Sequence, residues 1–440
     1  MQQPARVLGP FDATCIVIGA IIGVGIFFNP AKVAAPVETP TLALACWGLG
    51  GLLALCGALA FAELGRRYHA SGAQYEVLRD AAGPLPAFLY VFCNATAIQA
   101  GAIAVIAVVC AQNLAIAAGV PGSPLVVPAG VALIVALVVA NVAGVRWGSR
   151  IQNLTVVAKL LTLLAIIAIA LTLAPARPAT APAPPPSALP GVLGVLAGLV
   201  HTFFAYGGFQ HALWIGGEVR DPRRNVPRAI VVGVLIVVAV YVLANWAYLR
   251  LLGHDGVAGS KGLAAEAVGA AWPGAGRVVA GAVALSAFGV LNAQLLSGPR
   301  LVYGMARDGR FFRPFAALHP RFGTPVAAIV LLGVMAVALL LAAGFGGVDK
   351  LTTGVVFIDG VFFALTAASV LILRARRAWP QAQGRAVPGA TAAAAVFFVG
   401  ELGLLTGAYL DPSTRSAAFI GVGWIVVAAG VYLVRFRSKR

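Results

Sequence analysis

The stretch Gly19-Ala20-Ile21-Ile22-Gly23-Val24-Gly25 lies in the middle of an apolar run that extends over residues 11–36. Glycine in a helix interior costs about 1 kcal/mol relative to alanine, so this cluster predicts that the backbone opens there. A second cluster, Tyr206-Gly207-Gly208-Phe209, interrupts the apolar run over residues 190–217 in the same way. The sequence therefore predicts two helices that are broken near their middles.

The composition places these helices in a lipid bilayer. Hydrophobic residues make up 60% of the 440 residues and charged residues only 10%, whereas soluble domains are about half apolar and a quarter charged. A bilayer core about 30 Å thick needs roughly 20 apolar residues per helix. That window predicts an all-α integral membrane protein with twelve spans, at 11–36, 41–64, 84–118, 125–143, 151–173, 190–217, 229–252, 276–305, 325–344, 350–374, 388–409 and 416–435.

The net charge of +17 predicts the orientation of the chain. Lys and Arg form short clusters between the apolar runs instead of one basic domain, which argues against a nucleic acid partner. Of the 31 basic residues, 22 fall on one side of the predicted spans and 6 on the other, with Lys32, Lys159 and Arg300 inside spans. The positive-inside rule then places both termini in the cytoplasm. We expect a multi-pass protein of the cytoplasmic (inner) membrane.

The remaining features exclude several classes of protein. No loop is large enough for a second domain, so residues 1–440 form one transmembrane domain, with a proline-rich external connection at 174–190. The five cysteines lie in apolar segments without a CxxC pair, which argues against disulfides and zinc. There is no Walker A loop and no catalytic triad. We therefore expect no enzyme, no cofactor and no metal, and any uphill transport would depend on a gradient or on exchange.

An opened helix inside a membrane needs partners for its free backbone groups, because lipid supplies none. Free N–H groups attract a carboxylate and free carbonyls attract an ammonium; an amino acid carries both on one carbon. The alternative is that the glycines only allow close helix packing. The breaks fall in spans one and six, the first members of two sets of five helices at 11–173 and 190–374. Paired breaks of this kind are typical of inverted-repeat transporters, with 388–435 as two additional helices.

The segments around the breaks resemble the amino acid–polyamine–organocation superfamily, and within it the bacterial relatives of the L-type amino acid transporters. The resemblance covers nearly the whole chain. It implies a leucine-transporter type of fold, with a five-plus-five inverted repeat, broken helices 1 and 6, and secondary transport by alternating access. The segments that carry it are GAIIGVGIF (19–27), FAELGRRYHASGAQYEVLRDAAGP (61–84), FFAYGGFQ (203–210) with GEVRDPRRNVPRAI (217–230), and GPRLVYGMARDGRFF (298–312) followed by HPRFGTP (319–325).

The resemblance also implies a substrate site. The substrate carboxylate would be held by the backbone N–H groups of Gly23, Val24 and Gly25. The substrate ammonium would be received by the carbonyls of Ile21, Phe203, Phe204 and Tyr206. The side chain of Phe204 would be the gating aromatic. Many relatives carry Ser or Thr at the position of Val24 and Trp at that of Phe209, so selectivity for the substrate side chain does not carry over.

Lys159 is the only Lys or Arg that we place deep in a central span. With Gln152, Thr155 and Thr162 it forms a polar stripe at helical spacing, which we expect to face the bundle interior. Sodium-independent members of the superfamily carry a lysine at the matching place. The resemblance therefore implies that Lys159 replaces a sodium ion bridging the broken first helix to the scaffold, and it could also couple transport to protons. The alternative is a structural lysine paired permanently with carbonyls.

Several acidic residues complete the candidate set. Glu63, Glu218 and Asp221 stand among arginines, which predicts an ion-pair network at a cytoplasmic gate; solvated loop charge is the alternative. Asp359 is a possible buried carboxylate, for which we favour a structural or gating role near the external end. Glu401, in the eleventh span, is expected to serve packing or oligomer contact.

These features predict a sodium-independent permease that moves amino acids, with protons or a counter-substrate as coupling partners. A neutral amino acid is favoured, because no acidic residue stands near either break in the sequence. The nearest alternative is a carrier of polyamines or cationic amino acids. An ion channel and a non-transporting sensor are the rivals from other classes; saturable uptake with counter-transport would exclude the channel.

Overall fold

The computed structural model describes residues 4–172, 191–272, 274–343, 348–380, 386–410 and 412–436. Within several helices some side chains, including those of Phe203 and Phe204, lie outside the described part. The predicted proline-rich connection at 174–190 lies outside it as well.

The regular secondary structure of the described residues is helical, apart from an isolated bridge that pairs Leu8 with Val219. The first part of the chain contains α1 (Pro10–Ile21), η1 (Gly25–Phe27), α2 (Asn29–Ala34), α3 (Pro40–Arg67), α4 (Ala73–Ala82), α5 (Pro84–Cys93), the π-helical η2 (Asn94–Ile98), α6 (Gln99–Ala117), α7 (Val126–Val142) and α8 (Val145–Thr172). The second part contains α9 (Val192–Ala205), α10 (His211–Trp214), η3 (Gly216–Glu218), α11 (Pro222–Ala258), α12 (Leu263–Gly269), α13 (Gly276–Ser297), α14 (Pro299–Arg307), η4 (Arg313–Ala316), α15 (Val326–Ala343), α16 (Val348–Ala375), α17 (Ala390–Leu410) and α18 (Pro412–Arg435).

Eight helices in the described residues are long and apolar enough to cross a membrane, and four apolar helices are shorter. Two of the shorter ones lie in α1 and α9, and these helices end at Ile21 and Ala205, at the two predicted breaks. The regular structure of the described residues is thus all-α, as predicted, and its long apolar helices fit the predicted membrane class. That twelve helices cross the bilayer in a leucine-transporter arrangement remains a prediction.

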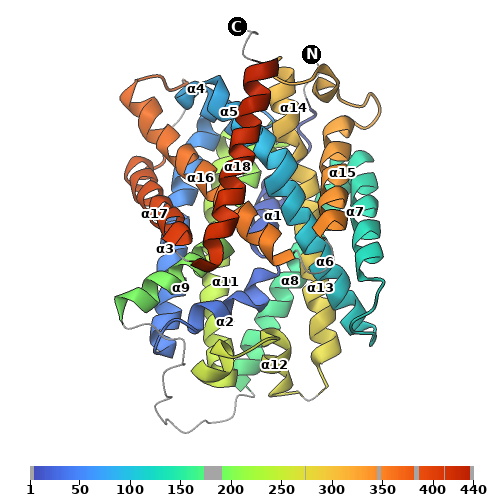
Figure 1. Cartoon of the computed structure of the whole chain (residues 1–440), viewed down its shortest axis with the longest axis vertical. Helices are drawn as coiled ribbons and strands as arrows, with labels where there is room; N and C mark the ends of the chain where they lie inside the picture. The colour runs from blue at the N-terminus through green and yellow to red at the C-terminus, as the bar shows by residue number, and fades with distance from the viewer. Residues whose placement is uncertain are drawn as a thin grey trace.

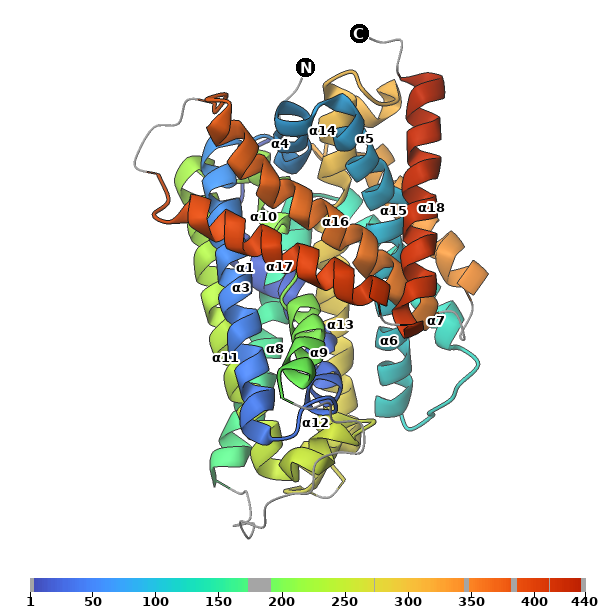
Figure 2. The same cartoon turned by 60° about the vertical axis from the view of Figure 1, so that its left-hand side comes forward.

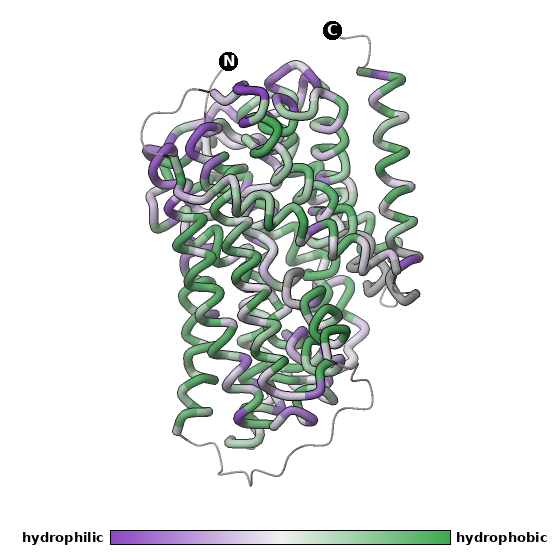
Figure 3. The backbone as a smooth tube through the Cα atoms, turned by 90° about the vertical axis from the view of Figure 1, so that its left-hand side faces the viewer, coloured by the Kyte–Doolittle hydropathy of each residue, from purple (hydrophilic) through white to green (hydrophobic). Residues whose placement is uncertain are grey.

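Both termini lie at one end of the molecule (Figure 1). Hydrophobic residues cover the middle, and hydrophilic stretches gather toward the ends (Figure 3). Basic clusters that we predicted on one side are joined by contacts: the Arg79 guanidinium lies 2.9 Å from Asp308, and Arg376 donates a hydrogen bond to the Ala81 carbonyl. The clusters therefore share one end of the structure.

The broken first helix lies inside the bundle, where α1 packs against α8, α11 and α13. Helix α17 packs along α16 and crosses α3 obliquely (Figure 2). This arrangement surrounds the breaks with helices from both halves of the chain.

Candidate functional site

The first helix breaks because its glycines end the regular backbone. Pro10 at its first turn and the Asp12 carboxylate, which accepts a hydrogen bond from Gly9 N at 2.7 Å, begin α1. It ends at Ile21, since Ile22 has an extended ψ of 90°. Regular structure resumes only with η1 at Gly25. The predicted break is therefore present at the predicted residues.

The second break follows α9, which ends at Ala205. Gly208 has φ of +127°, a conformation that L side chains rarely adopt. A β-carbon on Gly208 would lie 2.8 Å from the carbonyl carbon and oxygen of Ala20. The two breaks therefore touch backbone to backbone, which only glycine allows. The glycines allow close packing, and the helices are also open at them. The structure therefore fits both interpretations of the glycine clusters, as packing positions and as helix breaks.

Side chains from two helices, α8 and α11, donate hydrogen bonds to carbonyls at the first break. Lys159 of α8 donates to the Ile22 carbonyl at 2.6 Å and to that of Gly19 at 3.3 Å. The Tyr241 hydroxyl of α11 donates to the Ile21 carbonyl at 3.1 Å, so a substrate ammonium could use only that oxygen's second lone pair. Lys159 exposes 1% of its surface, and no carboxylate in the described chain forms an ion pair with it. Within the described residues, its hydrogen-bond acceptors are the two backbone carbonyls.

The polar stripe on α8 faces the bundle interior as expected. Gln152 and Thr155 are buried, and Thr162 is half-buried. A β-carbon on Gly289 of α13 would lie 2.6 Å from the Thr155 hydroxyl and 3.2 Å from the Lys159 nitrogen. Close approach of α13 thus closes off the lysine from one side.

The backbone N–H groups of Gly23, Val24 and Gly25 meet no acceptor within hydrogen-bond distance in the described part of the chain. All three residues line a cavity of about 270 Å³ together with Tyr206 and Gly208 of the second break. This volume is near the lower end of the range for small-molecule pockets. The Phe203 and Phe204 side chains, and with them the predicted gating aromatic, lie outside the described part.

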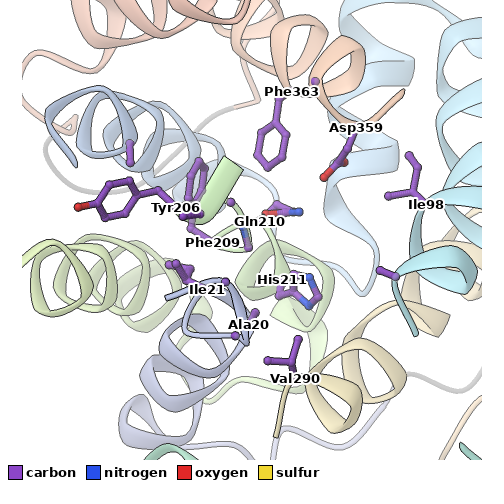
Figure 4. Close-up of a pocket in the computed structure, with 18 of the residues that line it drawn as sticks. Ala20, Ile21, Ile98, Tyr206, Phe209, Gln210, His211, Val290, Asp359 and Phe363 are labelled. Carbon is purple, nitrogen blue, oxygen red and sulfur yellow. Dashed lines mark hydrogen bonds between the residues drawn. The ribbon is translucent and has the colours of Figure 1, made fainter. Parts of the chain in front are cut away.

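The cavity is mainly apolar, but several polar side chains reach it. Figure 4 shows Asp359 and Phe363 across the cavity from Gln210, His211 and Ala20. Other polar side chains on its wall, which the sequence did not single out as site residues, are Asn29, Gln99 and Gln294. In the sequence, each of these residues is only a single amide inside an apolar run. Single amides are common in buried helices, so this pattern does not indicate a site.

Two carboxylates line this cavity, which corrects two expectations. Glu401 of α17 exposes 2% of its surface and faces the cavity with Asp359 of α16, although it was expected to serve packing or oligomer contact. One Glu401 oxygen lies 3.5 Å from the place of a β-carbon on Gly360, so the two acidic residues are neighbours. The premise that no acidic side chain stands near the breaks is thus wrong, because the tertiary fold brings α16 and α17 to them.

The three acidic residues of the predicted cytoplasmic gate have different partners. Glu218 forms a buried two-point ion pair with Arg300, at 3.1 and 3.2 Å. Glu63 pairs with Arg66 and Arg67 of its own helix, at 2.7 and 2.8 Å. Asp221 is exposed, 3.8 Å from the nearest Arg224 nitrogen. The three acids do not form one network within the described residues, and Arg300, which we had assigned only to a span, is the partner that the sequence missed.

Comparison with known proteins identifies the class of molecule. A model of the amino acid permease family matches residues 8–436. The chain belongs to the amino acid permease family. The permease is 30% identical over 373 residues to the serine/threonine exchanger SteT of Bacillus subtilis, covering 84% of this chain and 83% of that protein. It is also 30% identical to the human b(0,+)-type amino acid transporter 1, and the match covers 84% of this chain and 76% of that protein. Its identity to the human large neutral amino acids transporter small subunit 2 is 30% as well, and that match covers 83% of this chain and 69% of that protein. The permease is thus an amino acid transporter of the amino acid–polyamine–organocation superfamily and not an enzyme, as the sequence predicted.

Proposed function

We propose that the permease moves amino acids across the cytoplasmic membrane by alternating access and without sodium. The observation that carries this proposal is the position of the Lys159 ammonium between α8 and the carbonyls of Gly19 and Ile22. Carbonyls released by a helix break attract a cation. A tethered ammonium supplies that charge permanently, so the broken helix is joined to the scaffold without a bound ion.

In this proposal the substrate's charged groups bind at the two breaks. The carboxylate accepts hydrogen bonds from Gly23, Val24 and Gly25, whose N–H groups are unpaired in the described chain. The ammonium approaches the carbonyls of Ile21, Phe203, Phe204 and Tyr206, and Phe204 closes over the substrate. Both termini lie in the cytoplasm, and separation of Glu218 from Arg300, with adjustment around Glu63 and Asp221, opens the inward path.

We favour exchange over proton symport for the coupling. The name of the bacterial relative describes an exchanger, and Lys159 donates to two carbonyls that stabilise its charged form. Proton cycling at Lys159 is the alternative. A neutral amino acid remains the favoured substrate. The second candidate is a cationic amino acid or polyamine, which Asp359 and Glu401 on the cavity wall favour.

The test is uptake of a radiolabelled amino acid panel into proteoliposomes under separately imposed proton and sodium gradients. We expect saturable uptake that requires internal amino acid and ignores sodium. Lys159→Ala should abolish it, because the freed carbonyls lose their cation. Lys32→Ala is the matched control, since Lys32 is an exposed lysine on α2 beside the Phe28 ring. Sodium-dependent uptake, or normal uptake by the Lys159 variant, would refute the sodium-free proposal; non-saturable flux would favour a channel.

A further inference from the structure

Three side-chain amides on the cavity wall have atoms without a partner. They belong to Asn29, Gln99 and Gln294, which expose 3%, 3% and 8% of their surfaces. The Asn29 nitrogen and the side-chain oxygens of Gln99 and Gln294 are buried and meet no hydrogen-bond partner within the described residues. Buried polar groups in folded proteins are nearly always paired, so unpaired amides on residues that line a cavity are candidates for contact with a substrate.

The side-chain oxygens of the other buried glutamines in the described chain are paired, unlike those of Gln99 and Gln294. The Gln74 oxygen accepts from Tyr90 and Trp214, at 2.7 Å in each case. The Gln152 oxygen accepts from Asn292 at 3.0 Å. Even Gln210, which also lines the cavity, accepts from the Gly208 nitrogen at 3.0 Å. Among the buried glutamines of the described residues, only Gln99 and Gln294 have an unpaired side-chain oxygen, and both residues line the cavity; the other unpaired amide atoms belong to asparagines.

One face of α13 connects the first break to both glutamines. Val290, Gln294 and Gly298 follow one another at four-residue spacing, so they share that face. The Val290 side chain lies 3.4 Å from the place of a β-carbon on Gly23, and the Gln99 side chain lies 3.5 Å from that on Gly298. Four residues of helix rise about 6 Å, so Gln294 begins about 6 Å along the axis from the break. Figure 4 shows Val290 and Ile98, the residue before Gln99, both at the cavity.

We propose that Gln99 and Gln294 bind the side chain of the substrate, and that the permease selects uncharged amino acids whose side chains form hydrogen bonds. This inference rests on the proposed function and narrows its substrate class. A carboxamide both donates and accepts in either orientation. It therefore matches a hydroxyl or a carboxamide, which also does both. A distance of about 6 Å along α13 suits side chains from serine to glutamine when the substrate's charged groups sit at the break.

The two carboxylates do not require a cationic side chain. Asp359 and Glu401 lie on α16 and α17, and both residues line the cavity. Their helices lie across the cavity from α13, which is the helix that contacts Gly23 directly. A substrate fixed at the first break therefore meets the glutamines on the wall that touches the break.

The experiment measures uptake into proteoliposomes with pairs of amino acids of similar size, glutamine against methionine and threonine against valine. Wild type, Gln99→Met and Gln294→Met are compared, because methionine keeps the volume and removes both hydrogen-bonding groups. Gln112→Met is the matched control: Gln112 lies on α6 with Gln99 but does not line the cavity. Size-exclusion profiles establish that each variant is folded.

We expect wild type to take up the polar member of each pair at least about tenfold faster than the apolar member. In each cavity variant the ratio of the two uptake rates should be about tenfold smaller than in wild type. Uptake of the apolar member should stay within about twofold, and the control should behave as wild type. Equal uptake within the pairs by wild type, preference for lysine, or a preference retained in both cavity variants would overturn the inference. If the variants do not fold, the wild-type ratios alone decide it. Uptake of valine and methionine without preference would refute only this inference, whereas the lack of saturable uptake of any amino acid would refute the proposed function itself.

Discussion

The contact between the two breaks predicts a large effect for Gly208→Ala. The added methyl carbon would lie 2.8 Å from the carbonyl carbon and oxygen of Ala20 and 2.9 Å from the Ile21 nitrogen. These are backbone atoms, so they cannot move aside as a flexible side chain can. Overpacking costs about 1–3 kcal/mol, and the φ of +127° at Gly208 costs an L residue about 1–3 kcal/mol more. We therefore expect the free energy of unfolding to fall by about 2–6 kcal/mol.

The assay combines thermal unfolding of the purified permease in detergent with amino acid uptake in proteoliposomes. Gly208→Ala should unfold at a lower temperature and lose most of its uptake, because separating the breaks also disturbs the groups that bind the substrate. Gly48→Ala is the control, since a β-carbon there meets no atom within 4 Å and Gly48 lies inside α3. Alanine should stabilise that helix by up to about 1 kcal/mol. A Gly208→Ala protein with wild-type stability and uptake would refute the backbone contact.

Two further predictions concern the end of the molecule where the termini lie. Arg300→Met should lower the free energy of unfolding by about 3–5 kcal/mol, because it leaves the Glu218 carboxylate buried without its partner; thermal unfolding measures this. Burial, followed by the nearby charges of Arg223 and Arg6, lowers the pKa of His69 below its usual 6.5. The unfolded chain then binds a proton at His69 that the folded chain rejects, so this contribution to stability is present above about pH 6.5 and is lost as the pH falls below it. Unfolding measured against pH should show a smaller acid loss for His69→Gln than for wild type.

Each of these two predictions has a control variant, in which a residue of the same type is replaced elsewhere in the chain. Arg224→Met removes an arginine whose ion pair with Asp221 spans 3.8 Å at the surface; it should change stability by less than about 1 kcal/mol. Equal losses for the Arg224 and Arg300 variants would contradict the buried pair. For the pH prediction, His319→Gln changes a histidine in a loop outside the buried contacts of His69. An identical acid loss in wild type and His69→Gln would contradict the role of His69.

The apolar helices and the two breaks could be predicted because their signals are local. Apolar runs of about 20 residues mark the helices; α1 ends inside the first glycine cluster and α9 ends just before the second. The place of Lys159 could also be predicted, because a single lysine in an apolar helix must turn toward the oxygen atoms of the interior. Its particular partners, the carbonyls of Gly19 and Ile22, agree with the bridge to the first helix that the resemblance implied.

The rest of the site depends on contacts between helices far apart in the chain. Glu218 and Arg300 are 82 residues apart, and no local pattern joins them. Glu401 looked remote because it belongs to the eleventh predicted span, yet α17 packs along α16 and brings it to the cavity. Gln99 and Gln294 differ from other buried glutamines only in having unpaired oxygen atoms. Whether an oxygen atom is paired depends on contacts between distant segments, so it cannot be predicted from residue spacing.

The contacts at the termini explain how the two broken helices could move together. Leu8, just before α1, donates its N–H to the Glu218 carbonyl at 2.9 Å and accepts from Arg220 N at 2.8 Å. These backbone bonds join the short segments of both broken helices, whereas the Glu218–Arg300 ion pair ties them to α14. An ion pair is strong when buried and weakens when water reaches it. Entry of water at this end would therefore loosen the tie to α14, while the backbone bonds of Leu8 keep the short segments of both broken helices joined.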